Sequence, residues 1–111
     1  MKKVLGKISE AVFGLGGYQE CQLGLHLAFE INRSGIRTSY ATWDSEKIKH
    51  NSNCNWTEEY REDEYIRIFK VVSKLLDYAK VTTVNNLVGI PVEIELDGNT
   101  FIDFRILTEV L

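Results

Sequence analysis

Alternating apolar and polar residues mark the first half of the chain as β-structure. Large apolar residues occupy every second position from Leu23 to Ile31, and small or polar residues fill the positions between them. A period of two places one set on a buried strand face and the other on an exposed face. Less regular patterns predict strands over Val4–Phe13 and Ile36–Trp43, and the polar stretch 32–35 predicts the turn that joins the second and third strands.

A different period predicts one long amphipathic helix over Thr57–Ala79. Apolar residues recur there at steps of three and four, which gathers them on one stripe; they are Tyr65, Ile68, Phe69, Val72, Leu75, Leu76 and Ala79. Acidic residues crowd the first turns and lysines come late, an order that suits the helix dipole. Asn55 and Thr57 are rival N-caps, because either side chain could accept a hydrogen bond from the first turn.

The chain returns to β-structure behind Pro91, the only proline, which a strand tolerates best at its start. Val92, Ile94 and Leu96 alternate with acids, Asp97-Gly98-Asn99 is a strong hairpin signal, and Thr100–Val110 predicts the last strand. The order β-β-β-α-β-β with short connections predicts an antiparallel sheet of about five strands. We expect one α+β domain over residues 1–111, with the helix on the sheet face that carries Leu23, Leu25, Leu27 and Phe29.

Composition supports a compact protein that is not an integral membrane protein. The 111 residues are 44% hydrophobic and 26% charged, enough to build a core. No apolar run approaches the roughly 18 residues of a membrane span, and the N-terminus lacks the apolar segment of a signal peptide. We therefore expect a cytoplasmic protein with no membrane partner. Cys21 and Cys54 match no paired motif, so two separate thiols are expected.

Charge argues against duplex nucleic acid as a partner. Residues 1–56 carry seven Lys and Arg and five Asp and Glu, while residues 57–111 carry six and eleven, so the two parts have net charges of +2 and −5. Proteins that bind duplexes use clustered Lys and Arg to neutralise phosphates. No such stripe occurs along this sequence.

The most unusual local feature is the segment Gly14-Leu15-Gly16-Gly17-Tyr18-Gln19. Glycines tolerate positive φ, so we expect a turn between the first two strands. Its N–H groups could cradle an anion, which makes Gly14, Gly16, Gly17, Tyr18 and Gln19 candidate ligand-binding residues. The other interpretation is a turn or bulge with no ligand. No helix follows, so a dinucleotide fingerprint is excluded.

Four aromatic residues near expected loops or strand ends extend this candidate site. Tyr18, Tyr40, Trp43 and Trp56 could stack on a base or anchor a protein partner. Each could instead pack within the fold, and Trp56 could staple the start of the helix.

Metal and catalytic chemistry have weaker support. Cys21, His26, His50 and Cys54 have suitable atoms, but their spacing follows no zinc pattern or nucleophile pattern. Glu93, Glu95 and Asp97 match a solvated strand face better than an acid–base pair. We therefore expect no metal, no cofactor and no enzymatic activity.

Four segments together resemble a group of small phage and prophage accessory proteins that carry a Gly-Phe-Gly-Gly-Tyr-Gln-like loop. The segments are Val12–Glu20, Cys54–Glu59, Leu87–Glu93 and Phe104–Leu111, and the resemblance spans most of the chain. The sequence departs from the group at Leu15, where an aromatic residue is usual, and between Glu30 and Asp44.

The resemblance implies a phage origin and the cytoplasm of an infected host as the setting. Small phage accessory proteins of this kind often counter bacterial defences, so it implies a protein that acts by binding. One hypothesis is capture of a nucleotide signal by the glycine loop and the aromatics, with a homo-oligomer enclosing the ligand. The rival is a direct inhibitor of a host defence protein, or an acidic DNA mimic that uses the start of the helix.

Overall fold

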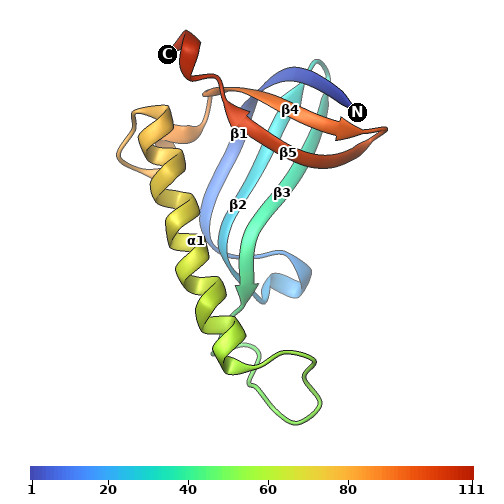
Figure 1. Ribbon diagram of the computed structural model, residues 1–111, viewed down its shortest axis with the longest axis vertical. Coiled ribbons are helices and arrows are strands. Elements are labelled where there is room, and N and C mark those ends of the chain that lie inside the picture. Colours follow the sequence, from blue (N-terminus) through green and yellow to red (C-terminus); the bar gives the residue numbers. More distant parts are fainter.

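The computed structural model describes all residues 1–111 and consists of one sheet and one long helix (Figure 1). The strands are β1 (Lys2–Gly16), β2 (Gln22–Ile31), β3 (Ser34–Trp43), β4 (Pro91–Asp97) and β5 (Thr100–Ile106), and the helix is α1 (Glu58–Ala79). Three short 3-10 turns, η1 (Tyr18–Glu20), η2 (Val84–Leu87) and η3 (Thr108–Val110), complete the chain. The element order confirms the predicted fold class.

All five strands form a single antiparallel sheet in the order β3-β2-β1-β4-β5. β1 lies at its centre and changes partner along its length. Its first part, Lys2–Lys7, pairs with β4, while Lys7–Gly16 pairs with β2 on the other side. A bulge between Ile8 and Glu10 marks the change. The second part of β1 therefore has a strand neighbour on one side only.

The helix covers the face of the sheet that the sequence predicts, and the core lies between them. Leu25, Leu27 and Phe29 on β2 are at most 1% exposed. The sheet curls, so that β5 crosses in front of the first three strands (Figure 1). The ring of Phe104 on β5 consequently lies 4.8 Å from that of Phe29, measured between centroids.

Local capping fixes both ends of α1. The Thr57 hydroxyl accepts a hydrogen bond from the Tyr60 N–H at 3.0 Å, which identifies Thr57 rather than Asn55 as the N-cap. At the other end Lys80 adopts a left-handed conformation, and its N–H donates to the Asp77 carbonyl. No helix of this chain is both long enough and apolar enough to span a bilayer.

Two predicted boundaries are wrong. β1 continues beyond Phe13 to Gly16, because Gly14 pairs with Gly24 and Gly16 pairs with Gln22 across the ladder. The turn therefore contains only Gly17 of the glycine cluster. β5 ends at Ile106 rather than Val110, because Leu107 bends the backbone and donates its N–H to the Pro91 carbonyl before η3 begins.

Candidate functional site

The glycine positions and their neighbours lie on the sheet face opposite α1, which we call the outer face. Opposed residues of an antiparallel pair share a face, so the register places Gly14 beside Gly24 and Gly16 beside Gln22 there. The next row on β3 adds Ala41 and Trp43. Gly14 and Gly16 thus leave this face of β1 without side chains, whereas Gly24 on β2 is buried.

A groove of about 350 Å³, which we call the outer groove, lies on the outer face next to these positions, and Gly16 and Gly17 are the glycines that line it. Its lining comes from β1, β2, β3 and the start of the turn, and consists of Glu10, Val12, Leu15, Gly16, Gly17, His26, Leu27, Arg37, Thr38 and Ser39. The volume falls at the lower end of the range for small-molecule sites. The groove combines bare backbone with one imidazole, one guanidinium and one carboxylate.

His26 is held rigidly in the floor of the groove. Its Nε2 lies 3.1 Å from the Gly14 carbonyl oxygen and 3.2 Å from that of Gln22, and its Nδ1 lies 2.7 Å from Ser39 Oγ. Because carbonyl oxygens only accept, Nε2 carries a proton, and in the neutral ring Nδ1 accepts from the Ser39 hydroxyl. A hydroxyl beside an oriented imidazole is also how a nucleophile is activated. Here both ring nitrogens are used to fix a flat ring against the strands.

Arg37 supplies the positive charge of the groove, and Glu10 balances it. The Arg37 guanidinium donates to Glu10 at 3.1 Å across the width of β2, and both side chains are more than half exposed. An exposed ion pair of this kind contributes little to stability. Arg37 is therefore able to exchange its partner for an anionic ligand.

The structure separates the predicted glycine site into two parts. Gly14 and Gly16 belong to β1, whereas Gly17, Tyr18 and Gln19 form the turn. Gly17 has φ +67°, and a Cβ there would lie 2.5 Å from the Gln22 side-chain oxygen. Gly17 accepts from the Glu20 N–H at 3.2 Å, and Tyr18 is 69% exposed beside it. Tyr18 thus stands free at the end of the groove.

Tyr40 lies on the other side of the sheet from the glycines. It pairs with Leu25 and faces the core, where its ring centroid is 6.4 Å from that of Phe104. Burial raises the pKa of Tyr40 to about 12, and the nearby carboxylate of Asp103 adds to the shift. The structure therefore gives Tyr40 a packing role and separates it from the outer groove.

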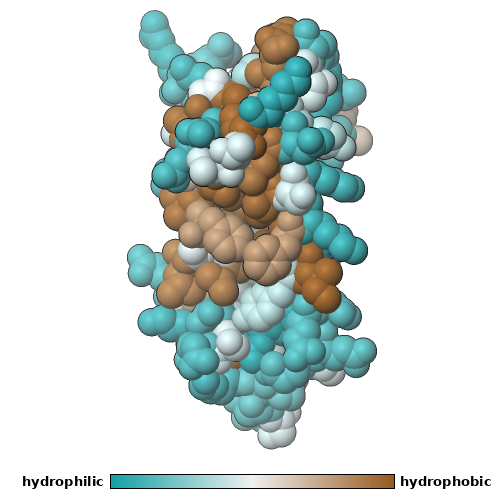
Figure 2. Space-filling model, turned by 90° about the vertical axis from the view of Figure 1, so that its left-hand side faces the viewer, coloured by the Kyte–Doolittle hydropathy of each residue, from teal (hydrophilic) through white to brown (hydrophobic).

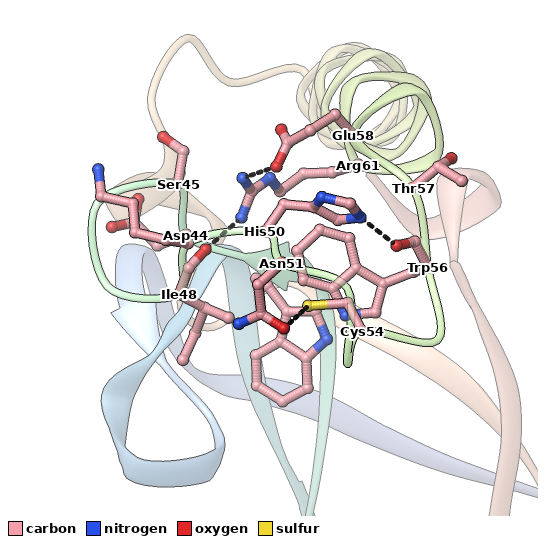
Figure 3. A network of polar contacts seen from close by, with 12 residues as sticks. Asp44, Ser45, Ile48, His50, Asn51, Cys54, Trp56, Thr57, Glu58 and Arg61 are labelled. Carbon is pink, nitrogen blue, oxygen red and sulfur yellow. Dashed lines mark hydrogen bonds and ion pairs between the residues drawn. The ribbon is translucent and has the colours of Figure 1, made fainter.

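Trp43 and Trp56 lie near the same end of the molecule but in different settings. Trp43 ends β3 opposite Gln22, so it shares the row of Gly16. Trp56 belongs to the loop before α1, where the Arg61 guanidinium carbon lies 4.8 Å from its ring centroid (Figure 3). Of the four aromatic candidates, Trp43 and Tyr18 border the glycine region and Tyr40 and Trp56 do not.

The loop around Trp56 is organised by Arg61, which is only 3% exposed (Figure 3). Arg61 donates to the Ile48 carbonyl at 2.6 Å and forms an ion pair with Glu58. His50 donates to the Trp56 carbonyl at 2.9 Å. These contacts are all internal, so we assign the network to holding the 44–57 loop against α1.

Of the polar residues of the outer groove, the sequence singles out His26 alone, as a candidate for metal or nucleophile chemistry, and not Glu10, Arg37 or Ser39. The alternation along β2 shows that His26 lies on the polar face of that strand, but it does not show which residues of β1 and β3 lie beside His26. Ser39, Arg37 and Glu10 join it only through the register of three strands. The sequence-predicted metal candidates do not converge, because no three His, Cys, Asp or Glu side chains lie close enough together to hold a metal ion.

Comparison with known proteins adds no relative, because no protein-family model, curated protein or solved structure matches this chain.

Proposed function

We propose that this is a phage accessory protein that acts in the host cytoplasm by binding, and that the outer groove captures a small nucleotide. The feature that carries the proposal is a bare glycine backbone beside the fixed ring of His26 and the exchangeable guanidinium of Arg37. Nucleotides offer a flat base and an anionic phosphate, which suit these two elements.

The groove favours a base over His26 and the glycines, and a phosphate at Arg37. Peptide planes and an imidazole present flat surfaces for stacking. Arg37 can form two parallel hydrogen bonds to phosphate oxygens. Tyr18 is exposed in the turn next to Gly17, at the end away from Arg37, where a second ring would meet it; Trp43 shares the row of Gly16 but does not line the groove. This division of roles replaces the idea that the turn amides hold the phosphate.

Glu10 sets the electrostatic condition for binding. Its carboxylate faces Arg37 and repels an incoming phosphate. Glu10→Gln is therefore expected to tighten nucleotide binding severalfold, whereas Arg37→Gln is expected to weaken it by about tenfold or more. Each substitution breaks the same exposed ion pair, so a loss of stability would weaken binding in both variants. Opposite effects on binding would therefore come from the charges themselves.

The test is a thermal-shift panel of cyclic and linear nucleotides. A nucleotide present at a hundred times its Kd raises the unfolding free energy by about 2.7 kcal/mol, or the Tm by roughly 10 °C for a domain of this size. Gly14→Val should abolish the shift, because a side chain there would stand on the outer face between Val12 and Gly16, which both line the groove, and would meet nothing else within 4 Å of its Cβ. Thr100→Val is the control, since Thr100 is exposed at the start of β5 and lines neither the groove nor the pocket beside Arg37. No shift with any nucleotide, or an equal shift with Gly14→Val, would refute the proposal.

A further inference from the structure

The second half of β1 presents an open backbone edge to the surroundings. Residues Glu10–Gly16 pair with β2 alone. On the other side of β1, pairing with β4 stops at Lys7, and the last backbone hydrogen bonds join Ile8 to Gly89 and Ile90. No backbone hydrogen bond outside the strands and helices involves residues 9–16. Alternate N–H and C=O groups on this side are therefore free to pair with another strand.

The other two sheet edges are protected, which makes this one unusual. β3 lies alongside α1, with Glu64 and Arg67 near Ser39 and Ala41. β5 is seven residues long and carries Asp103 and Arg105. Charged side chains and covering elements are the usual protection of edge strands. By contrast, the β1 edge carries no charge after Glu10.

An exposed apolar patch borders this edge. Its members, from β1 and α1, lie on the α1 side of the edge and are Phe13, Leu15, Ile66 and Phe69, each between 43% and 66% exposed; Val12, 44% exposed, borders the edge on the outer face. The Phe13 and Phe69 rings join the two elements with centroids 6.2 Å apart. Figure 2, which faces the side of β1 and α1, shows hydrophobic side chains gathered in a band down this side. The exposed parts of the four side chains amount to roughly 300 Å² of apolar surface, the size at which an exposed patch on a monomer is often functional.

We propose that a second copy of this chain covers this surface, by pairing β1 of the two copies edge to edge in an antiparallel manner around a two-fold axis. Pairing that uses all of Glu10–Gly16 places Phe13 against its symmetry mate and Glu10 against Gly16, so no like charges meet. The two sheets then form one continuous sheet of ten strands, because each copy contributes five.

Charge along α1 favours a second copy over an unrelated strand. α1 runs beside β1 in the opposite direction, so the same two-fold axis sets the helices of the two copies antiparallel (Figure 1). Ile66 and Phe69 lie between Glu62 on the N-terminal side and Lys70 on the C-terminal side, and neither charge has an ion-pair partner within the chain. Each acidic half would then face the basic half of its mate.

The pairing would also enlarge the outer groove. The two-fold axis of an antiparallel strand pair is perpendicular to the sheet, so the outer faces of both copies point to the same side. Glu10 and Val12 form the rim of the groove on the β1 side, next to the proposed seam. Two grooves would meet there. The dimer itself rests on the edge and the patch and does not depend on the proposed function.

Sedimentation of the purified full chain tests the pairing without any ligand. We expect twice the chain mass of 12.7 kDa at micromolar concentration. Leu15→Lys and Phe69→Glu should each raise the dissociation constant of the dimer by about tenfold or more, because each would bury a charge. Ile102→Lys is the control, since Ile102 is 46% exposed on β5 and outside the patch. Hydrogen exchange should slow at residues 10–16 as the dimer forms.

A chain that stays monomeric at 100 µM overturns the proposal, and so does a monomer whose patch is covered by a host protein instead. A dimer that survives both patch variants, or that dissociates equally with Ile102→Lys, also overturns it. Nucleotide binding by a monomeric wild-type chain would reject the dimer and leave the proposed function standing.

Discussion

The imidazole of His26 fills the space that a side chain at Gly16 would need. A Cβ built on Gly16 would lie 2.8 Å from His26 Nε2, whereas one built on Gly14 would meet no atom within 4 Å. Two glycines on the same face of β1 therefore serve different purposes. Gly16 lets His26 lie against the strand, and Gly14 leaves open space beside it.

This difference predicts opposite tolerance to alanine. Gly16→Ala should lower the free energy of unfolding by about 1–3 kcal/mol, because His26 must move and give up its hydrogen bonds. Gly14→Ala should leave it unchanged or raise it by about 0.5 kcal/mol, because alanine restricts the unfolded chain more than glycine does. Urea denaturation measures both. Equal losses would mean that His26 does not occupy the position described.

Arg61 is predicted to matter far more than the other arginine of α1. Arg61→Ala should lower the unfolding free energy by about 2–4 kcal/mol, because the Ile48 carbonyl and the Trp56 ring lose a buried partner. Arg67→Ala is the matched control, since its ion pair with Glu64 leaves the Arg67 side chain 68% exposed, and should cost less than about 1 kcal/mol. Similar losses in thermal unfolding would contradict this account.

The start of α1 offers a test between two rival caps. Thr57→Ala should lower the unfolding free energy by about 1 kcal/mol, because the Tyr60 N–H loses its acceptor. Asn55→Ala should change it by less than about 0.5 kcal/mol, since Asn55 lies outside the cap. Chemical denaturation of the two variants side by side would decide the assignment, and a larger effect at Asn55 would reverse it.

Much of the fold can be predicted from the sequence because local patterns of apolar and polar residues determine its elements. The period of two in β2 and the three-and-four period of α1 place both elements within a few residues, and Asp97-Gly98-Asn99 places the β4–β5 hairpin. The extension of β1 was missed, since glycine has weak strand preference and only pairing with Gly24 and Gln22 holds it there. The position of β4 beside β1 is likewise a long-range pairing that no local signal specifies.

The site was harder to predict because its residues come together across strands. The glycines were identified correctly as unusual, but a turn was inferred where β1 continues. Tyr40 and Trp56 were grouped with them by proximity to loops, yet the register turns Tyr40 toward the core and Arg61 holds Trp56. Arg61 itself did leave a signal, since it lies four residues before Tyr65 on the apolar stripe.

The partly buried phenol of Tyr40 should make the free energy of unfolding fall in alkali. Burial, followed by Asp103, raises its pKa to about 12 from 10.0, so the folded chain keeps a proton that the unfolded chain releases. The resulting stability is fully present below pH 10 and is lost as the pH rises toward 12. Tyr40→Phe should flatten the fall of unfolding free energy over this range. An unchanged slope would show that Tyr40 does not contribute.

Nucleotide binding in the outer groove can be located residue by residue in an NMR titration. Amide resonances of the uniformly 15N-labelled chain would be followed as the nucleotide with the largest thermal shift is added. We expect the largest changes at Gly14, Gly16 and His26, with Gly14→Val abolishing them. Changes confined to α1 or the 44–57 loop, or none at millimolar nucleotide, would show that no nucleotide binds in the groove.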